Sequence, residues 1–149
     1  MANRCVIWMI GTTVAAFVTD RILKQLAISG STLGPPDGGV RFELLPNPAI
    51  AFSLALPSTL TMWLIPPVLV VFVWLGVRLV RRGEHVRAAA AGMVVVGSLS
   101  NYLDRLQHGF VVDYVSFGTW FPVFNLSDWL IVAGLIVLIV RLDGRRTTR

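Results

Sequence analysis

Two aspartates, Asp113 and Asp128, are the residues of this sequence best suited to acid–base chemistry. Asp113 is the only charged residue in the otherwise apolar run 110–117, and Asp128 ends the segment Asn-Leu-Ser-Asp at 125–128. Two carboxylates that share a site cannot both ionise easily, so one keeps a proton while the other activates water. If the two side chains meet, they predict the chemistry of an aspartic protease.

Each aspartate also has a simpler interpretation. The simpler interpretation of Asp113 is that it is a lone charge on an edge strand. The segment 125–128 has the form of a capping box, with Asn125 as the N-cap and Asp128 at the third helical position. The cap and the acid–base role are compatible, because the positive end of a helix favours the charged form of a carboxylate.

Other catalytic classes have few residues to draw on. Cys5 is the single cysteine, His85 lies in the second connection and His108 stands alone, so we expect no metal site and no cofactor. Lys24 is the sole lysine and could act as the base of a Ser/Lys dyad, which stays an alternative. The candidate serines are Ser98, Ser100 and Ser127.

Long apolar segments must position these residues. The chain is 55% hydrophobic and only 14% charged, and its mean hydropathy is +0.72, which is typical of a membrane protein. Residues 58–77 include no charged residue and are long enough to cross a hydrocarbon core of about 30 Å. Pro66 and Pro67 lie within this segment, and a membrane helix with packed neighbours tolerates them.

We therefore predict an all-α membrane protein in which a single membrane domain covers residues 1–149. Its four transmembrane helices are expected at about 5–27, 58–80, 87–106 and 124–142. The turn-rich first connection leads into a short strand at 40–45, and the run 110–117 is also typical of a strand. These two segments predict a small extracytoplasmic cap that contains β-structure.

The basic residues indicate how the helices are oriented. Nine of the thirteen lie at the N-terminus, in the second connection or at the C-terminus, and the positive-inside rule makes these segments cytoplasmic. The net charge of +5 is thereby explained without nucleic-acid binding. Six of the eight acidic residues fall in the opposite, outer half, so any chemistry is expected near the outer face.

Ionisable residues inside predicted helices need a partner or a function, because a charge at the centre of the membrane costs about 2.5–3.5 kcal/mol on insertion scales. Asp20 and Lys24 are four residues apart on one helix face and can pair with each other. Asp104 and Arg105 are neighbours and cannot face each other, so a solvated position or an interhelical pair is expected for them.

Four polar segments, taken in order, resemble the lipoprotein signal peptidase (signal peptidase II) family. They are Thr-Asp-Arg-Ile-Leu-Lys at 19–24, Asn-Pro-Ala-Ile-Ala-Phe-Ser at 47–53, the segment 97–114 with its Asn, Asp-Arg and Val-Val-Asp-Tyr, and Phe-Asn-Leu-Ser-Asp at 124–128. The resemblance implies that Asp113 and Asp128 are the catalytic pair. It also implies six supporting or substrate-binding residues: Asp20, Lys24, Asn47, Asn101, Arg105 and Asn125. Asp104 matches the aspartate before the family's arginine and is taken as structural.

The same resemblance implies the reaction and the location. The substrate would be a bacterial prolipoprotein with a diacylglyceryl group on its cysteine, and the enzyme would cut just before that cysteine in the cytoplasmic membrane. Membrane lipids are the other expected partners, and the oligomeric state is left open. A small proton-coupled four-helix transporter and a non-catalytic relative are the alternatives.

The sequence departs from the family pattern at three positions. Ala49 follows an unusual Pro48 where glycine is usual, Ser127 stands in place of alanine, and Trp129 replaces a small residue after the second aspartate. Ser127 and Trp129 are expected to narrow or re-aim the site. The departures concern substrate preference more than the type of reaction.

Overall fold

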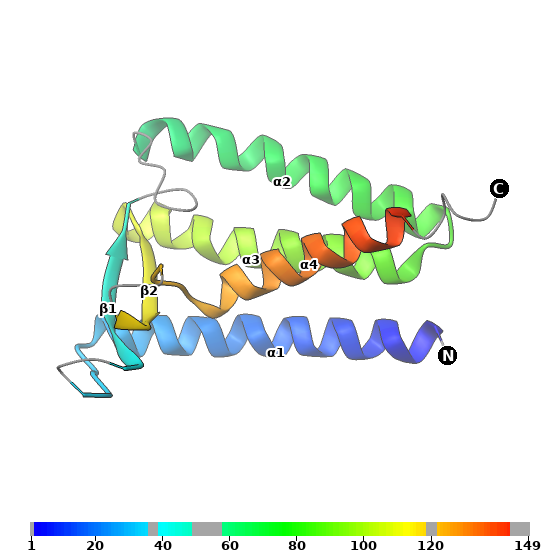
Figure 1. Cartoon of the computed structure of the whole chain (residues 1–149). Coiled ribbons are helices and arrows are strands. Elements are labelled where there is room, and N and C mark those ends of the chain that lie inside the picture. The colour runs from blue at the N-terminus through cyan, green and yellow to red at the C-terminus, as the bar shows by residue number, and fades with distance from the viewer. Residues whose placement is uncertain (1, 36–38, 49–57, 119–121, 144–149) are drawn as a thin grey trace.

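The computed structural model describes residues 2–35, 39–48, 58–118 and 122–143, and it is mostly helical. Four helices and two strands make up this part of the chain, and the strands lie together at one end of the helices (Figure 1). In chain order the elements are α1 (Ala2–Ile28), β1 (Arg41–Asn47), α2 (Ser58–Arg81), α3 (His85–His108), β2 (Val111–Ser116) and α4 (Leu126–Asp143). The expected helices and strands are all present, with ends that differ by a few residues.

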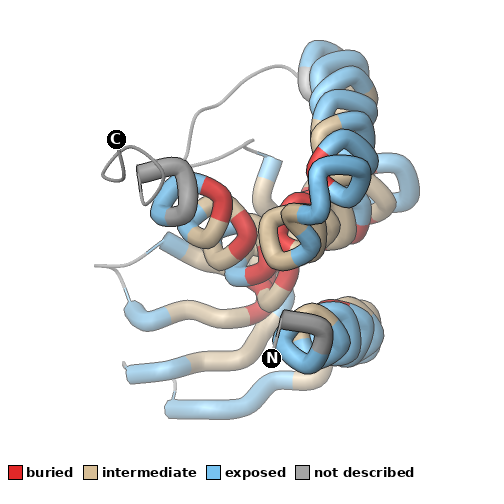
Figure 2. The backbone as a smooth tube through the Cα atoms, turned by 90° about the vertical axis from the view of Figure 1, so that its right-hand side faces the viewer, coloured by how far each residue is buried: buried red, intermediate tan, exposed pale blue. Residues whose placement is uncertain are grey.

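Within the described residues, three helices are long and apolar enough to cross a membrane. They are Arg4–Ile28, Met62–Arg81 and His85–His108, and the apolar part of α4, Leu126–Val140, is shorter. Pro66 and Pro67 lie inside α2 without ending it. Large apolar side chains such as Trp8 and Trp63 are exposed on the outer surface, as expected where helices face lipid. Figure 2 shows this exposure along the outward surfaces of α1 and α2.

Helix α3 is the centre of the bundle and packs against α1, α2 and α4 (Figure 1). Two glycines allow α3 and α4 to approach closely. A Cβ added at Gly97 would lie 2.5 Å from the carbonyl oxygen of Ser127, and one added at Gly134 would lie 2.6 Å from that of Ala90. Small residues at such contacts are typical of helix packing in membranes.

The two strands form an antiparallel sheet in which Leu45 is opposite Asp113 and Asn47 is opposite Val111. A turn at Gly109, in the left-handed conformation with φ of 79°, connects the end of α3 to β2. Val112 and Tyr114 pack with Ala27 in a buried apolar cluster, which attaches the sheet to the end of α1. The ends of α1 and α3, the sheet and the start of α4 therefore meet at one end of the bundle.

Candidate active site

The two candidate aspartates lie where β2 and the first turn of α4 come together. The backbone amides of Tyr114 and Val115 both donate to the carbonyl oxygen of Phe124, at 3.3 and 3.1 Å. These bonds bring the segment before α4 alongside β2, so Asp113 on the strand and Asp128 on the helix are placed at the same end of the bundle.

Asp113 is fully buried between two asparagine side chains. The Nδ2 of Asn47 donates to its Oδ2 at 2.8 Å, and the Nδ2 of Asn125 donates to its Oδ1 at 2.6 Å. Burial raises the pKa of Asp113 to about 6, and the negative charge of Asp128 acts in the same direction, whereas the two amide donors oppose the shift. Asp113 does lie on a strand of a two-stranded sheet, but it is buried and bonded to two amides, so it is not the lone edge-strand charge of the simpler interpretation.

Asp128 lies in the first turn of α4 and is only partly buried. The expected capping box is confirmed, because the backbone N–H of Asp128 donates to Asn125 Oδ1 at 3.0 Å and that of Asn125 donates to Asp128 Oδ2 at 3.2 Å. The other carboxylate oxygen, Oδ1, accepts a bond from Asn101 Nδ2 at 2.8 Å. Asp128 thus caps the helix and keeps one oxygen directed to a side chain of α3.

Asn125 connects the two aspartates through one side chain. Its Oδ1 caps the backbone at Asp128, while its Nδ2 donates to the carboxylate of Asp113. Since this side chain is fully buried, its position is fixed by its surroundings. Asn125 therefore links the strand that carries Asp113 to the helix that carries Asp128.

Lys24 is the centre of a second polar cluster, which Asn101 connects to Asp128. Its Nζ is 2.6 Å from Asp104 Oδ2 and 3.2 Å from Asp20 Oδ2, and it donates to Asn101 Oδ1 at 2.8 Å. Lys24 and both carboxylates are fully buried. This arrangement orients the Asn101 amide, because its oxygen is occupied by Lys24 and its nitrogen is left to bind Asp128.

The same contacts argue against a Ser/Lys dyad. A lysine base must be neutral, whereas Lys24 forms ion pairs with two buried carboxylates. The hydroxyl of Ser100, the serine within reach of Lys24 at 3.5 Å, donates instead to Asp20 at 2.8 Å. Lys24 consequently holds the polar cluster together and is unsuited to removing a proton from serine.

Asp104 joins α1, α3 and the sheet. It pairs with Lys24 and with Arg21 Nη1, the latter at 2.5 Å, and its Oδ2 accepts the backbone N–H of Val112 at 3.2 Å. The expectation of an interhelical pair is confirmed, and a solvated position is excluded by complete burial. Arg21 was not among the candidate residues.

Asp20 fixes the start of α4 to α1, which the local pairing with Lys24 did not predict. Its carboxylate accepts bonds from the Ser127 hydroxyl at 2.6 Å, the Ser127 backbone N–H at 3.2 Å and the Tyr114 hydroxyl at 2.9 Å. Tyr114 in turn accepts the backbone N–H of Leu126 at 2.9 Å. Burial and the charge of Asp20 raise the pKa of Tyr114, so its phenol stays protonated and can donate.

Arg105 is the remaining candidate, and its side chain is buried next to the two aspartates. Its Nη1 donates to the backbone oxygen of Asn101 at 3.2 Å, and its positive charge interacts with the carboxylates of Asp128, Asp104 and Asp113. Arg105 therefore contributes a positive charge to a region with several carboxylates.

The geometry as a whole can hold one ionised and one protonated carboxyl next to each other, as general acid–base catalysis requires.

Comparison with known proteins assigns the family. A sequence model described as Signal peptidase (SPase) II matches residues 12–142. The chain belongs to the signal peptidase II family. A lipoprotein signal peptidase of Syntrophomonas wolfei is 30% identical over 145 residues, covering 93% of this chain and 96% of the relative. One of Rhodococcus jostii is 37% identical over 152 residues, covering 93% and 72%.

Solved structures share the fold. A bacterial membrane enzyme superposes with a TM-score of 0.73 at 20% identity, covering 95% of this chain and 90% of the other. A second bacterial membrane enzyme gives a TM-score of 0.65 at 20% identity, covering 90% and 91%. The arrangement of helices and sheet in this signal peptidase II chain thus occurs in solved bacterial membrane enzymes.

Two of the residues that depart from the family pattern, Ser127 and Trp129, lie in the described part of the chain. The hydroxyl of Ser127 is fully buried and bonded to Asp20, so this serine adds a link between α4 and α1. Trp129 is 55% exposed, and its ring packs edge-on against Phe124 at 5.8 Å between centroids. Ala49 lies outside the described residues. Of the two residues expected to narrow or re-aim the site, Trp129 is exposed and Ser127 is buried.

Proposed function

We propose that this chain is an aspartic endopeptidase that removes signal peptides from diacylglyceryl-modified prolipoproteins, cutting the peptide bond before the lipidated cysteine. The observation that supports it best is the pair of contacts made by Asn125. One side chain binds the carboxylate of Asp113 and caps the helix turn that holds Asp128. Membership of the signal peptidase II family and the names of the relatives support the choice of substrate.

In the proposed reaction Asp113 carries the proton of the resting pair and Asp128 is the base. Asp113 is fully buried between two amide donors, whereas Asp128 is partly exposed to solvent and its carboxylate accepts bonds from the Asn101 amide and from the backbone N–H of Asn125 at the start of α4. Asp128 takes a proton from water, whose oxygen attacks the scissile carbonyl carbon. Asp113 gives its proton to the carbonyl oxygen.

The resulting tetrahedral intermediate then breaks down. Asp128 returns the proton taken from water to the leaving nitrogen, the carbon–nitrogen bond breaks, and a hydroxyl proton of the intermediate passes back to Asp113. One water is consumed, and the dyad regains its starting protonation state. No metal or cofactor takes part in this scheme.

The six other candidate residues divide into two groups. Three asparagines bind the dyad directly, namely Asn47, Asn101 and Asn125. Three charged residues act as positioning residues: Asp20, Lys24 and Arg105. A hydrogen bond to a charged group contributes about 1.5–3 kcal/mol, so this support is large enough to fix the dyad.

We also propose an orientation for the membrane domain, taken as residues 1–149, in a bacterial cytoplasmic membrane. Both termini lie in the cytoplasm and the dyad lies near the outer face, because the basic residues gather at the opposite end of the helices. There the lipid chains of the substrate would hold its scissile bond at the depth of the dyad. A reporter fused after Arg149 should be active only in the cytoplasm, and activity only outside would overturn this orientation.

The two alternatives fit these contacts less well. A proton-coupled transporter needs an acidic residue near the middle of a helix that can exchange a proton. Asp20 and Asp104 are instead buried in ion pairs with Lys24, and Asp113 lies on a strand. A non-catalytic relative would have no need of two carboxylates held by three asparagines.

The proposal is tested by incubating the purified protein with a diacylglyceryl-modified prolipoprotein and with the same precursor lacking the lipid. Mass spectrometry of the products should show cleavage immediately before the cysteine in the modified precursor only. Cleavage of both precursors would contradict the proposed lipid requirement. Absence of any product from folded protein would favour the non-catalytic relative.

A further inference from the structure

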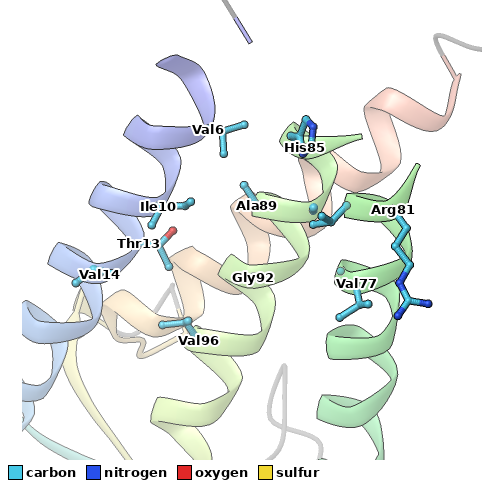
Figure 3. Close-up of a pocket in the computed structure, with 13 residues that line it drawn as sticks. Val6, Ile10, Thr13, Val14, Val77, Arg81, His85, Ala89, Gly92 and Val96 are labelled. Carbon is cyan, nitrogen blue, oxygen red and sulfur yellow. The ribbon is translucent and has the colours of Figure 1, made fainter. Parts of the chain in front are cut away.

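A groove that includes none of the candidate site residues lies between α1 and α2 and is also lined by the central helix α3 (Figure 3). It is present because α1 and α2 both pack on α3, so the space between them is left open. Along α3 it extends from His85 to Val96, whereas Asn101, which binds the dyad, lies further towards the sheet. At about 1.5 Å per residue, Val96 at the near end of the groove is roughly 8 Å along α3 from Asn101, and His85 at the other end is roughly 24 Å from it.

The walls of the groove are apolar and its volume is about 600 Å³. Ile10 of α1 and Val77 of α2 face it from either side and are about half exposed, and Gly92 and Val96 of α3 form its floor (Figure 3). The hydroxyl of Thr13, which also lines it, donates to the backbone oxygen of Met9 at 2.6 Å. Such a lining suits a hydrocarbon chain.

The end of the groove furthest from the sheet is basic. Arg81 and His85 are the ionisable residues among the described side chains that line it. Arg78 and Arg82 are exposed close by, while Glu84 pairs with Arg87 at 2.6 Å. The groove thus combines an apolar interior with a positively charged mouth.

The length of the groove matches one leaflet of a membrane. From His85 to Val96 the floor rises by roughly 17 Å, and half of a hydrocarbon core of about 30 Å is about 15 Å. We propose that this groove binds one acyl chain of an anionic phospholipid, whose phosphate is held at Arg81 and His85. In the orientation proposed above, this lipid belongs to the cytoplasmic leaflet, and basic pockets between helices on that side are known to bind anionic headgroups.

The charge at the mouth also decides against the signal peptide of a substrate as the occupant. A signal peptide begins with a positively charged region followed by its apolar segment. If the apolar segment lay in the groove, that region would meet Arg81 and the neighbouring arginines. Like charges repel, whereas an anionic headgroup is attracted by basic residues near the membrane surface.

The test measures lipid binding to the purified full chain in a neutral detergent by native mass spectrometry. Phosphatidylglycerol and phosphatidylcholine with identical acyl chains are the two probes. The protein should retain one phosphatidylglycerol, about fivefold or more tightly than phosphatidylcholine. Equal retention of the two lipids would overturn the proposal.

Two pairs of variants locate the site. Arg81→Gln should reduce the preference for phosphatidylglycerol about fivefold, while Arg82→Gln, at an exposed neighbour outside the groove, should change it less than twofold. Gly92→Leu fills the groove without meeting other atoms near its Cβ and should abolish the bound lipid. Gly11→Leu adds the same side chain on an exposed part of α1 outside the groove and should not affect binding.

Other outcomes contradict the proposal. If Arg81→Gln and Arg82→Gln reduced the preference for phosphatidylglycerol equally, the lipid would be attracted by the basic end of the helices in general and not bound in the groove. Unchanged lipid binding by a folded Gly92→Leu, together with a higher KM for prolipoprotein, would assign the groove to the signal peptide. Because lipid binding is measured without substrate, the binding results are independent of whether the proposed cleavage occurs, and only the comparison of KM values requires cleavage.

Discussion

Replacing Asp113 with asparagine should change how the stability of the protein depends on pH. In the folded protein the pKa of Asp113 is raised from 3.8 to about 6, chiefly by burial. Between these two values the folded state therefore binds more protons than the unfolded state, and stability falls as pH rises. Asparagine has a similar shape and carries no charge, so Asp113→Asn removes this fall.

The size of this pH dependence follows from the shift in the pKa of Asp113. A pKa change from 3.8 to about 6 corresponds to about 3 kcal/mol at a pH above both values. Between pH 4.5 and 7.5, about 2 kcal/mol of this should appear as a fall in wild-type stability relative to the variant. For a chain of about this length, 1 kcal/mol shifts Tm by about 2–4 °C. The difference in Tm between the wild type and Asp113→Asn should therefore change by about 4–8 °C across this pH range.

The assay is thermal unfolding of both proteins in one detergent, followed by tryptophan fluorescence across that pH range. A constant difference in Tm between Asp113→Asn and the wild type at every pH arises if one amide donor loses its acceptor, so only the change in this difference with pH is informative. Glu43→Gln removes a partly exposed charge paired with Arg41 and controls for loss of a charge from the sheet. Parallel curves for wild type and Asp113→Asn would refute the argument that burial of Asp113 disfavours its charge.

Two further predictions concern the residues around the dyad. Asn125→Ser keeps a good N-cap but loses the amide that binds Asp113, so kcat should fall about 10- to 100-fold, and Asn125→Ala, which loses the cap as well, should be less stable than Asn125→Ser by about 1 kcal/mol. Equal activity of the serine variant and the wild type would reduce Asn125 to a cap. Lys24→Met leaves two buried carboxylates without their cation and should destabilise the protein by about 3–5 kcal/mol in chemical unfolding, more than Arg21→Met, whose side chain is partly exposed. Similar losses for the two would contradict the central role given to Lys24.

The helices and the two strands could be predicted because their signals are local. An uncharged run such as 58–77 indicates a membrane helix without knowledge of its neighbours, and the capping box at Asn125 and Asp128 is read from four consecutive residues. The sequence also indicated that Asp20, Asp104 and Asp128 gather at one end of the bundle, since each lies towards an end of its predicted helix.

Contacts between distant elements could not be predicted from these signals. The spacing of Asp20 and Lys24 predicted their own ion pair, but the second pair of Lys24 with Asp104 depends on how α1 packs on α3. Tyr114 and Ser127 were missed as partners of Asp20 because neither has a charge and both approach from other elements. Tyr114 follows the candidate Asp113 directly, which is the one sequence signal that could have drawn attention to it.

The central claim is that Asp113 and Asp128 act together in cleavage. The measurement is the rate at which purified, folded Asp128→Asn processes a diacylglyceryl-modified prolipoprotein, compared with the wild type and with Asp113→Asn. Asparagine cannot exchange a proton as the base, so both variants should show no cleavage while remaining folded in the membrane. If Asp128 were only part of the helix cap, its replacement by asparagine would cost little stability and leave activity intact. Processing by Asp128→Asn at close to the wild-type rate would contradict the dyad and leave Asp128 only its role in the cap.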